Sequence, residues 1–223
     1  MTLLLVVTAV PAEADAVRAG LPDGAATVVP VGVGPAVAGA ATARLLALAE
    51  AGGRPYAGVV SAGVAGGFTD HVAVTGTVLG SSAIAADLGA ESPDGFIPVD
   101  RLGMPAELLG AGTTLTADRD LLAALRAGLP DATVGPILTV STVTGTTAGT
   151  AELRRRHPDA VAEAMEGYGV AVAAAQATVP FVELRTISNP IGPRDRAAWR
   201  LHEALQALTV ASAALPAVTT AGN

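Results

Sequence analysis

Apolar residues gather along the chain in short runs, separated by longer stretches that are amphipathic or rich in alanine. The short runs have the length and the β-branched composition of strands; they are 3–7, 27–31, 57–62, 72–79, 133–140 and 181–187. The longer stretches have helical length and composition; they are 36–50, 117–127, 168–177 and 197–213. Strands that are apolar throughout and alternate with helices indicate an α/β fold whose sheet is covered on both faces.

The gap between runs 57–62 and 72–79 is too short to hold a helix. That gap interrupts a simple doubly wound order and favours a curved sheet of mixed strand direction. The 223 residues contain no linker or repeat, and Gly and Pro are spread along the chain as loop punctuation. We expect a single domain over residues 1–223.

Charge and composition remove several classes of function. With 13 basic and 20 acidic residues the net charge is −7, which disfavours general binding to nucleic acid phosphates. Every basic residue is Arg and there is no Cys, so lysine Schiff bases, thiolate nucleophiles and cysteine metal sites are excluded. The apolar start of the chain lacks a preceding positive charge and has only about eight uninterrupted apolar residues. It is interpreted as a buried strand followed by a turn at Pro11, in a protein that we expect to be cytoplasmic and not bound to membranes.

Three weaker motifs have structural explanations as well as functional ones. Gly32 and Gly34 follow a strand, but Val37 stands where a dinucleotide fingerprint needs its third glycine, so a tight turn or a smaller ligand is favoured. The three histidines are scattered without metal-ligand spacing. The arginine run 154–156 fits a solvated helix end, where cations favour the helix dipole, better than an anion site.

Three segments stand out together. Residues 61–68 read SAGVAGGF directly after an apolar strand, and such small residues let backbone amides approach a ligand. Residues 164–170 read AMEGYGV and place Glu166 between a strand-like stretch and an Ala-rich helix, where a structural ion pair is the simpler alternative. Residues 181–195 read FVELRTISNPIGPRD, and Ser188 and Asn189 end that apolar strand, the position at which α/β folds bind ligands.

Met165-Glu166-Gly167, Ile187-Ser188-Asn189 and the loop 61–67 resemble, in order and spacing, the nucleoside phosphorylase/nucleosidase superfamily over nearly the whole chain. Glu-Gly-Tyr-Gly after Met165, the segment 141–146 and the segment 189–196 look most like its futalosine hydrolase family. The resemblance implies a three-layer α/β/α sandwich around a central mixed, partly closed β-sheet. It also implies a homodimer or higher homo-oligomer, a purine nucleoside substrate, water as co-substrate, and no cofactor.

The resemblance assigns the two carboxylates. Glu166 would accept hydrogen bonds from the 2′- and 3′-hydroxyls of ribose, and Met165 would pack beneath the sugar. Glu13 matches the carboxylate that activates water in methylthioadenosine nucleosidases. Without the family context, Glu13 is equally an exposed first-turn helix residue favoured by the dipole.

Asn189 stands where adenine-cleaving relatives carry Asp. An amide is not a proton donor of that kind, but it accepts from a protonated N7 and donates to a 6-oxo group, as hypoxanthine requires; a cap before Pro190 is the structural alternative. The remaining substrate-binding residues implied by the resemblance are Gly63, Val64, Thr144, Phe181, Ser188 and Trp199.

Compared with the phosphorylase pattern, hydrolysis is favoured over phosphorolysis because the first loop offers Glu13 rather than Arg, and Val59-Val60-Ser61, directly before the glycines, contain no Arg. Trp199 is expected to pack on the aromatic tail of the substrate. Arg194 or Arg196 would meet the carboxylate of that tail, unless either pairs with Asp195. The resemblance therefore implies hydrolysis of futalosine to hypoxanthine and dehypoxanthine futalosine. A methylthioadenosine/S-adenosylhomocysteine-type nucleosidase, a purine nucleoside phosphorylase and a non-catalytic nucleoside-binding module remain as alternatives.

Overall fold

The structure is a computed structural model, and it describes residues 3–105, 108 and 110–215. The strands are β1 (Leu4–Thr8), β2 (Ala26–Pro30), β3 (Gly58–Gly67), β4 (Thr77–Ala85), β5 (Gly89–Ser92), β6 (Gly95–Pro98), β7 (Thr114–Thr116), β8 (Thr133–Thr139), β9 (Ala162–Ala164) and β10 (Phe181–Pro190). The helices are α1 (Pro11–Gly20), α2 (Pro35–Ala51), α3 (Arg119–Gly128), α4 (Thr147–Arg156), α5 (Gly167–Gln176) and α6 (Leu201–Ser212), with short 3₁₀ turns at Val99–Arg101 and Arg196–Ala198.

The main sheet has eight strands in the order β10-β4-β8-β9-β3-β1-β2, with β7 attached to β4. β10 also pairs with β3, so β3, β9, β8, β4 and β10 close into a ring from which β1 and β2 extend. β10 runs parallel to β3 but antiparallel to β4, and β9 runs antiparallel to β3. The prediction of a mixed, partly closed sheet is confirmed.

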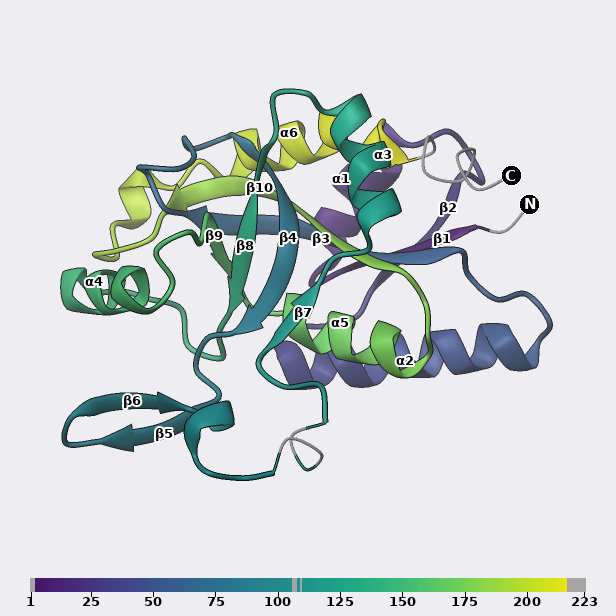
Figure 1. Ribbon diagram of the computed structural model, residues 1–223. Helices are drawn as coiled ribbons and strands as arrows, with labels where there is room; N and C mark the ends of the chain where they lie inside the picture. The colour runs from purple at the N-terminus through teal and green to yellow at the C-terminus, as the bar shows by residue number, and fades with distance from the viewer. Residues whose placement is uncertain (1–2, 106–107, 109, 216–223) are drawn as a thin grey trace.

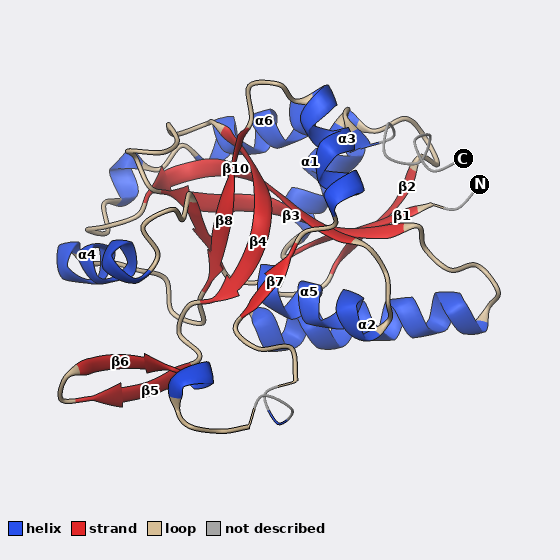
Figure 2. Ribbon diagram, viewed as in Figure 1, coloured by secondary structure: helices blue, strands red, loops and turns tan. Residues whose placement is uncertain are grey.

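Helices cover both faces of the open part of the sheet (Figures 1 and 2): α1, α3 and α6 lie on one side, and α2 and α5 on the other. The first four positions of β1 are all apolar because both faces of the strand are buried. Leu4 and Val6 pack into the core that contains Leu208 of α6, whereas Leu5 and Val7 pack into the core that contains Leu46 of α2. Successive side chains of a strand point to opposite faces, so a strand covered on both sides favours apolar residues at consecutive positions.

The structure corrects four boundaries. The segment 72–79 is a strand only from Thr77, because Thr75 has a φ of 70° and residues 72–76 form turns. The glycine-rich segment 61–67 is not a turn but the second half of β3. A helix, rather than a turn, begins at Pro11, whose fixed φ suits the first helical position. The last helix begins at Leu201, after a 3₁₀ turn that Asp195 caps.

The arginine run ends α4, as its composition predicts. Arg154 pairs with Asp70 and Arg155 pairs with Glu152, on the surface of the molecule. No helix in the described part of the chain is long and apolar enough to cross a membrane.

Candidate active site

Strand direction brings the candidate residues to one region of the sheet. β1, β3 and β10 are parallel neighbours: Glu13 follows β1 in the first turn of α1, Val64 lies in the second half of β3, and Arg185 lies near the middle of β10. β9 runs back along β3, with Gly67 opposite Ala162 and Gly66 opposite Glu163. The chain that leaves β9 therefore returns Glu166 toward the middle of β3.

Glu13 lies in the first turn of α1, but it is buried rather than exposed, with 4% of its surface accessible. One carboxylate oxygen, Oε2, accepts from the backbone amides of Ala9 at 2.9 Å and Val10 at 3.3 Å. The other, Oε1, accepts from the amide of Val64 at 2.9 Å. Glu13 therefore caps the start of its helix in the manner of a capping box and is tied to β3 at the same time.

Arg185 of β10 lies at the centre of the carboxylates and is 1% exposed. Its Nε donates to Glu183 Oε1 at 2.8 Å, and its Nη2 donates to Glu166 Oε2 at 3.3 Å and to Ser61 Oγ at 3.2 Å. The guanidinium also lies beside Glu13, because a Cβ on Gly63 would stand 2.6 Å from Glu13 Oε1 and 2.8 Å from Arg185 Nη1. Gly63 thus leaves the space in which the guanidinium and the Glu13 carboxylate meet.

The charges of this cluster shift the pKa values of its buried members. Burial raises the pKa of the Glu183 carboxyl, and Arg185 only partly opposes the effect. Burial by itself lowers the pKa of Arg185, but Glu183, Glu166 and Glu13 outweigh it and raise the pKa above its ordinary value. The guanidinium is therefore held firmly in its charged form among acidic neighbours.

Glu166 directly precedes α5 and is 6% exposed. Its Oε1 accepts from the backbone amide of Gly34 at 3.3 Å. Gly32 and Gly34 have φ values of 100° and 93°, a backbone conformation that favours glycine. The Gly32–Gly34 motif is accordingly a tight turn that presents an amide to Glu166.

Asn189 lines a cavity of about 110 Å³ together with Gly66, Thr144, Trp199 and Arg194, among others. The Ser188 hydroxyl donates to Asn189 Oδ1 at 2.8 Å, and Asn189 Nδ2 donates to the carbonyl of Pro190 at 2.9 Å. The Arg194 guanidinium lies 5.9 Å from the Trp199 ring centre. The side chain at the end of β10 is thus positioned beside a space with an aromatic wall.

The structure places Phe181 and Arg196 outside the wall of the Asn189 cavity, and Asp195 caps a turn. Phe181 is buried in the core at the start of β10, opposite Val59, whereas Asn189 is opposite Gly66. That position corrects the expectation that Phe181 lines the site, since the whole length of the strand separates it from Asn189. Arg196 is exposed and is not part of the cavity wall. Asp195 accepts from the amide of Ala197, and the described residues show no ion pair between Asp195 and an arginine.

The sequence interpretation missed Glu183 and Arg185. Their signal is present, because two charged residues alternate within an otherwise apolar strand and so share one face. Strand register explains why these two residues lie beside the glycine-rich part of β3: Glu183 is opposite Ser61, and Arg185 is opposite Gly63.

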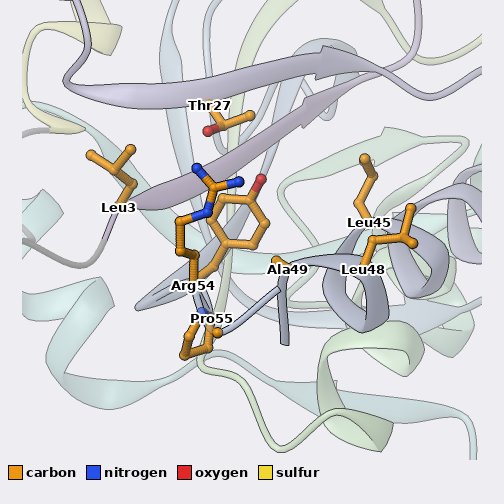
Figure 3. Close-up of a pocket in the computed structure, with 9 residues that line it drawn as sticks. Leu3, Thr27, Leu45, Leu48, Ala49, Arg54 and Pro55 are labelled. Carbon is orange, nitrogen blue, oxygen red and sulfur yellow. The ribbon is translucent and has the colours of Figure 1, made fainter. Parts of the chain in front are cut away.

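A larger cavity, of about 590 Å³, lies at the other end of the parallel strands (Figure 3). It is lined by residues that precede or begin β1, β2 and β3, among them Leu3, Thr27 and Tyr56, and by Arg54 and Leu48. None of the candidate residues lines it. In open α/β sheets ligands bind at the carboxyl ends of the strands, which favours the Asn189 cavity as the substrate site.

Comparison with known proteins shows the family to which the chain belongs. Residues 7–221 match the phosphorylase superfamily, so the chain belongs to that superfamily. Among solved structures, a 5′-methylthioadenosine/S-adenosylhomocysteine nucleosidase from Colwellia psychrerythraea in complex with adenine aligns with a TM-score of 0.78 and 23% identity, covering 96% of each chain. A futalosine hydrolase of Helicobacter pylori aligns with a TM-score of 0.75 and 17% identity, covering 99% of this chain and 98% of its own.

Two sequence relatives narrow the family further. The futalosine hydrolase of Streptomyces coelicolor is 50% identical over 92% of each chain. That of Acidothermus cellulolyticus is 48% identical over 96% of this chain and 90% of its own. Within the superfamily, the chain belongs to the futalosine hydrolase family.

Proposed function

We propose that this protein hydrolyses the N-ribosidic bond of futalosine and releases hypoxanthine, as a step of menaquinone biosynthesis. The observation that carries the proposal is the placement of Glu13 and Glu166 around the buried guanidinium of Arg185, on the strand β10 that also carries Asn189. The placement occurs in a chain that is half identical to a named futalosine hydrolase.

In this proposal Glu13 is the general base that takes a proton from the attacking water. Three backbone amides hold its carboxylate in a fixed orientation, which leaves the proton acceptor pre-positioned. Glu166 accepts the ribose hydroxyls, an interaction that strengthens as positive charge develops on the sugar. Asn189 holds the leaving base at its N7 and 6-oxo edge.

Arg185 is the positioning residue of this centre. It reaches Glu166, lies beside Glu13 and is itself held by Glu183 and Ser61, so it keeps two like charges close to the same sugar. Without a cation between them, two buried carboxylates at one site disfavour each other's ionised form.

The same charges favour water over phosphate as the nucleophile. In the part of the chain that the structure describes, Arg185 is the only fully buried cation, and carboxylates already engage it. A phosphate dianion that approached Glu13 and Glu166 would meet net negative charge. We therefore propose hydrolysis rather than phosphorolysis.

The experiment is incubation of the purified protein with futalosine, inosine and 5′-methylthioadenosine, each with and without phosphate, followed by chromatography of the products. We expect hypoxanthine from futalosine at a rate that does not depend on phosphate. Cleavage of methylthioadenosine but not of futalosine would refute the substrate assignment. Ribose 1-phosphate formed only with phosphate would refute hydrolysis, and tight nucleoside binding without turnover would refute an enzymatic role.

A further inference from the structure

Glu163 is a buried carboxylate of the Asn189 cavity, outside the cluster around Arg185. It is the central residue of β9, it is 6% exposed, and it lines the cavity together with Asn189 and Thr144. Its Oε1 accepts from the backbone amide of Thr144 at 2.8 Å, and its Oε2 accepts from the Thr144 hydroxyl at 2.5 Å. One short segment therefore fixes both oxygens of the carboxylate.

The position is unfavourable for a charge. No ion pair to Glu163 exists among the described residues, in contrast to Glu166 and Glu183, which both pair with Arg185. Burial raises the pKa of the Glu163 carboxyl, the two hydrogen bonds from Thr144 oppose this, and Asp87 adds a further rise. A buried carboxylate without a cation is costly, and the hydrogen bonds from Thr144 offset that cost only in part, so the geometry leaves the carboxylate able to accept from a ligand.

Strand register places Glu163 and Asn189 on the same side of the sheet. Gly66 of β3 lies opposite Glu163 of β9 and also opposite Asn189 of β10. With adjacent strands about 4.8 Å apart, the two polar residues stand roughly 10 Å from each other across a residue without a side chain. A Cβ on Gly66 would come within 3.0 Å of Ile191 and 3.4 Å of Asn189 Nδ2, so the glycine keeps this gap open.

A gap of this shape fits a flat purine held at two edges. Asn189 faces the N7 and 6-oxo edge, and the Glu163 carboxylate can then accept from the ring nitrogen next to the oxo group. In a 6-oxopurine that nitrogen, N1, carries a hydrogen, whereas in a 6-aminopurine it carries a lone pair. An ionised carboxylate attracts the first and repels the second.

We propose that Glu163 is the residue that selects a 6-oxopurine as the leaving base, by accepting a hydrogen bond from N1–H across Gly66 from Asn189. This inference rests on the proposed nucleosidase function and adds a base-recognition residue to it. Thr144 orients the carboxylate, because its amide and hydroxyl occupy one lone pair on each oxygen and leave the others for the base.

The test compares wild-type protein with Glu163→Gln on futalosine and on its 6-amino analogue. We expect kcat/KM for futalosine to fall about 10- to 100-fold, because a charge-assisted hydrogen bond is lost. The preference for futalosine over the 6-amino analogue should fall by at least the same factor, because glutamine also offers a donor to N1. Glu152→Gln, a change at a surface residue of α4, is the matched control and should alter neither value.

The thermal midpoint of unfolding distinguishes a role of Glu163 in base recognition from a purely structural role. The thermal midpoint of Glu163→Gln should equal or exceed that of the wild type, because the variant removes an unpaired buried charge. A lowered midpoint with unchanged base preference would overturn the proposal. Should Glu163→Gln not fold, Glu163→Leu supplies the same comparison, and an unchanged preference in that variant would equally overturn it.

The role of Glu163 in base recognition can be tested separately from the proposed hydrolysis of futalosine. Loss of futalosine cleavage by the wild-type protein would refute the proposed function. Calorimetric titration with hypoxanthine and adenine would then still decide the role of Glu163: a hypoxanthine preference that Glu163→Gln reduces at least tenfold supports it, and an equal ratio in both proteins overturns it.

Discussion

Replacement of Arg185 by methionine tests whether the carboxylate cluster depends on a single cation. Arg185 is 1% exposed, and its guanidinium separates Glu183, Glu166 and Glu13. Glu183 is fully buried and its Oε2 already has no hydrogen-bond partner. Methionine keeps much of the side-chain volume, so the main effect of the change is the loss of charge and of the hydrogen bonds.

Removal of one partner of a buried ion pair costs about 3–5 kcal/mol, because the other charge remains in the interior. For a chain of this length, each kcal/mol lowers the melting temperature by about 2–4 °C. We therefore expect the melting temperature of Arg185→Met, followed by circular dichroism at pH 7, to lie about 6–20 °C below that of the wild type. Arg185→Lys should lose less, because it keeps the charge without the forked geometry.

The pH dependence of that deficit gives an independent check. The folded-state pKa of Glu183 is raised above its ordinary value of 4.5, so its stabilising contribution is complete below that value and is lost as pH rises through the folded pKa. Arg185 opposes the rise, and its removal must increase the loss. The gap between variant and wild type should therefore narrow as pH falls from 7 toward 5. A melting temperature within about 2 °C of the wild type, or a gap independent of pH, would refute this account of the cluster.

Three further changes probe the site. Glu13→Gln should lower kcat for futalosine about 10²- to 10⁴-fold in steady-state assays with a modest fall in melting temperature, since its amide oxygen still accepts from Ala9 and Val10 but its NH2 group cannot accept from Val64; a near-normal rate would exclude Glu13 as the base. Gly63→Ala places a Cβ 2.6 Å from Glu13 Oε1 and 2.8 Å from Arg185 Nη1, so we expect a loss of about 1–3 kcal/mol in urea unfolding together with a lower kcat. Asn189→Asp should lower kcat/KM for futalosine at least about tenfold, because a carboxylate repels the 6-oxo group; equal values would remove Asn189 from base recognition.

The elements of the open part of the fold follow from local rules that the sequence states directly. β1 begins with four apolar residues and is buried on both faces, and α5 is rich in alanine and packs against the sheet. The strand boundaries of β4 and the strand character of the glycine-rich half of β3 did not follow from the sequence. In β3 the glycines are extended because β10 and β9 pair with them, which is a tertiary effect that overrides their low intrinsic strand preference.

The site likewise contains residues that the sequence indicated and one that only the structure revealed. Glu166 and Asn189 were candidates because each lies beside an apolar run within a recognisable motif, whereas Glu13 was assigned through the family resemblance. The sequence did not indicate a role for Glu163, because Ala-Glu-Ala within a three-residue strand has no motif of its own. Only the register of β9, β3 and β10 shows that Glu163 and Asn189 stand on either side of Gly66.

The sequence by itself determined the class of fold, and its family resemblance predicted two carboxylates and an amide as site residues. The tertiary structure decided which charges meet. Arg185 lies 19 residues from Glu166 and 124 from Ser61 in the chain, yet it donates to both. The reason is physical: hydrophobic periodicity and capping act over a few residues, whereas the balance of buried charges depends on strand pairing between segments distant in sequence.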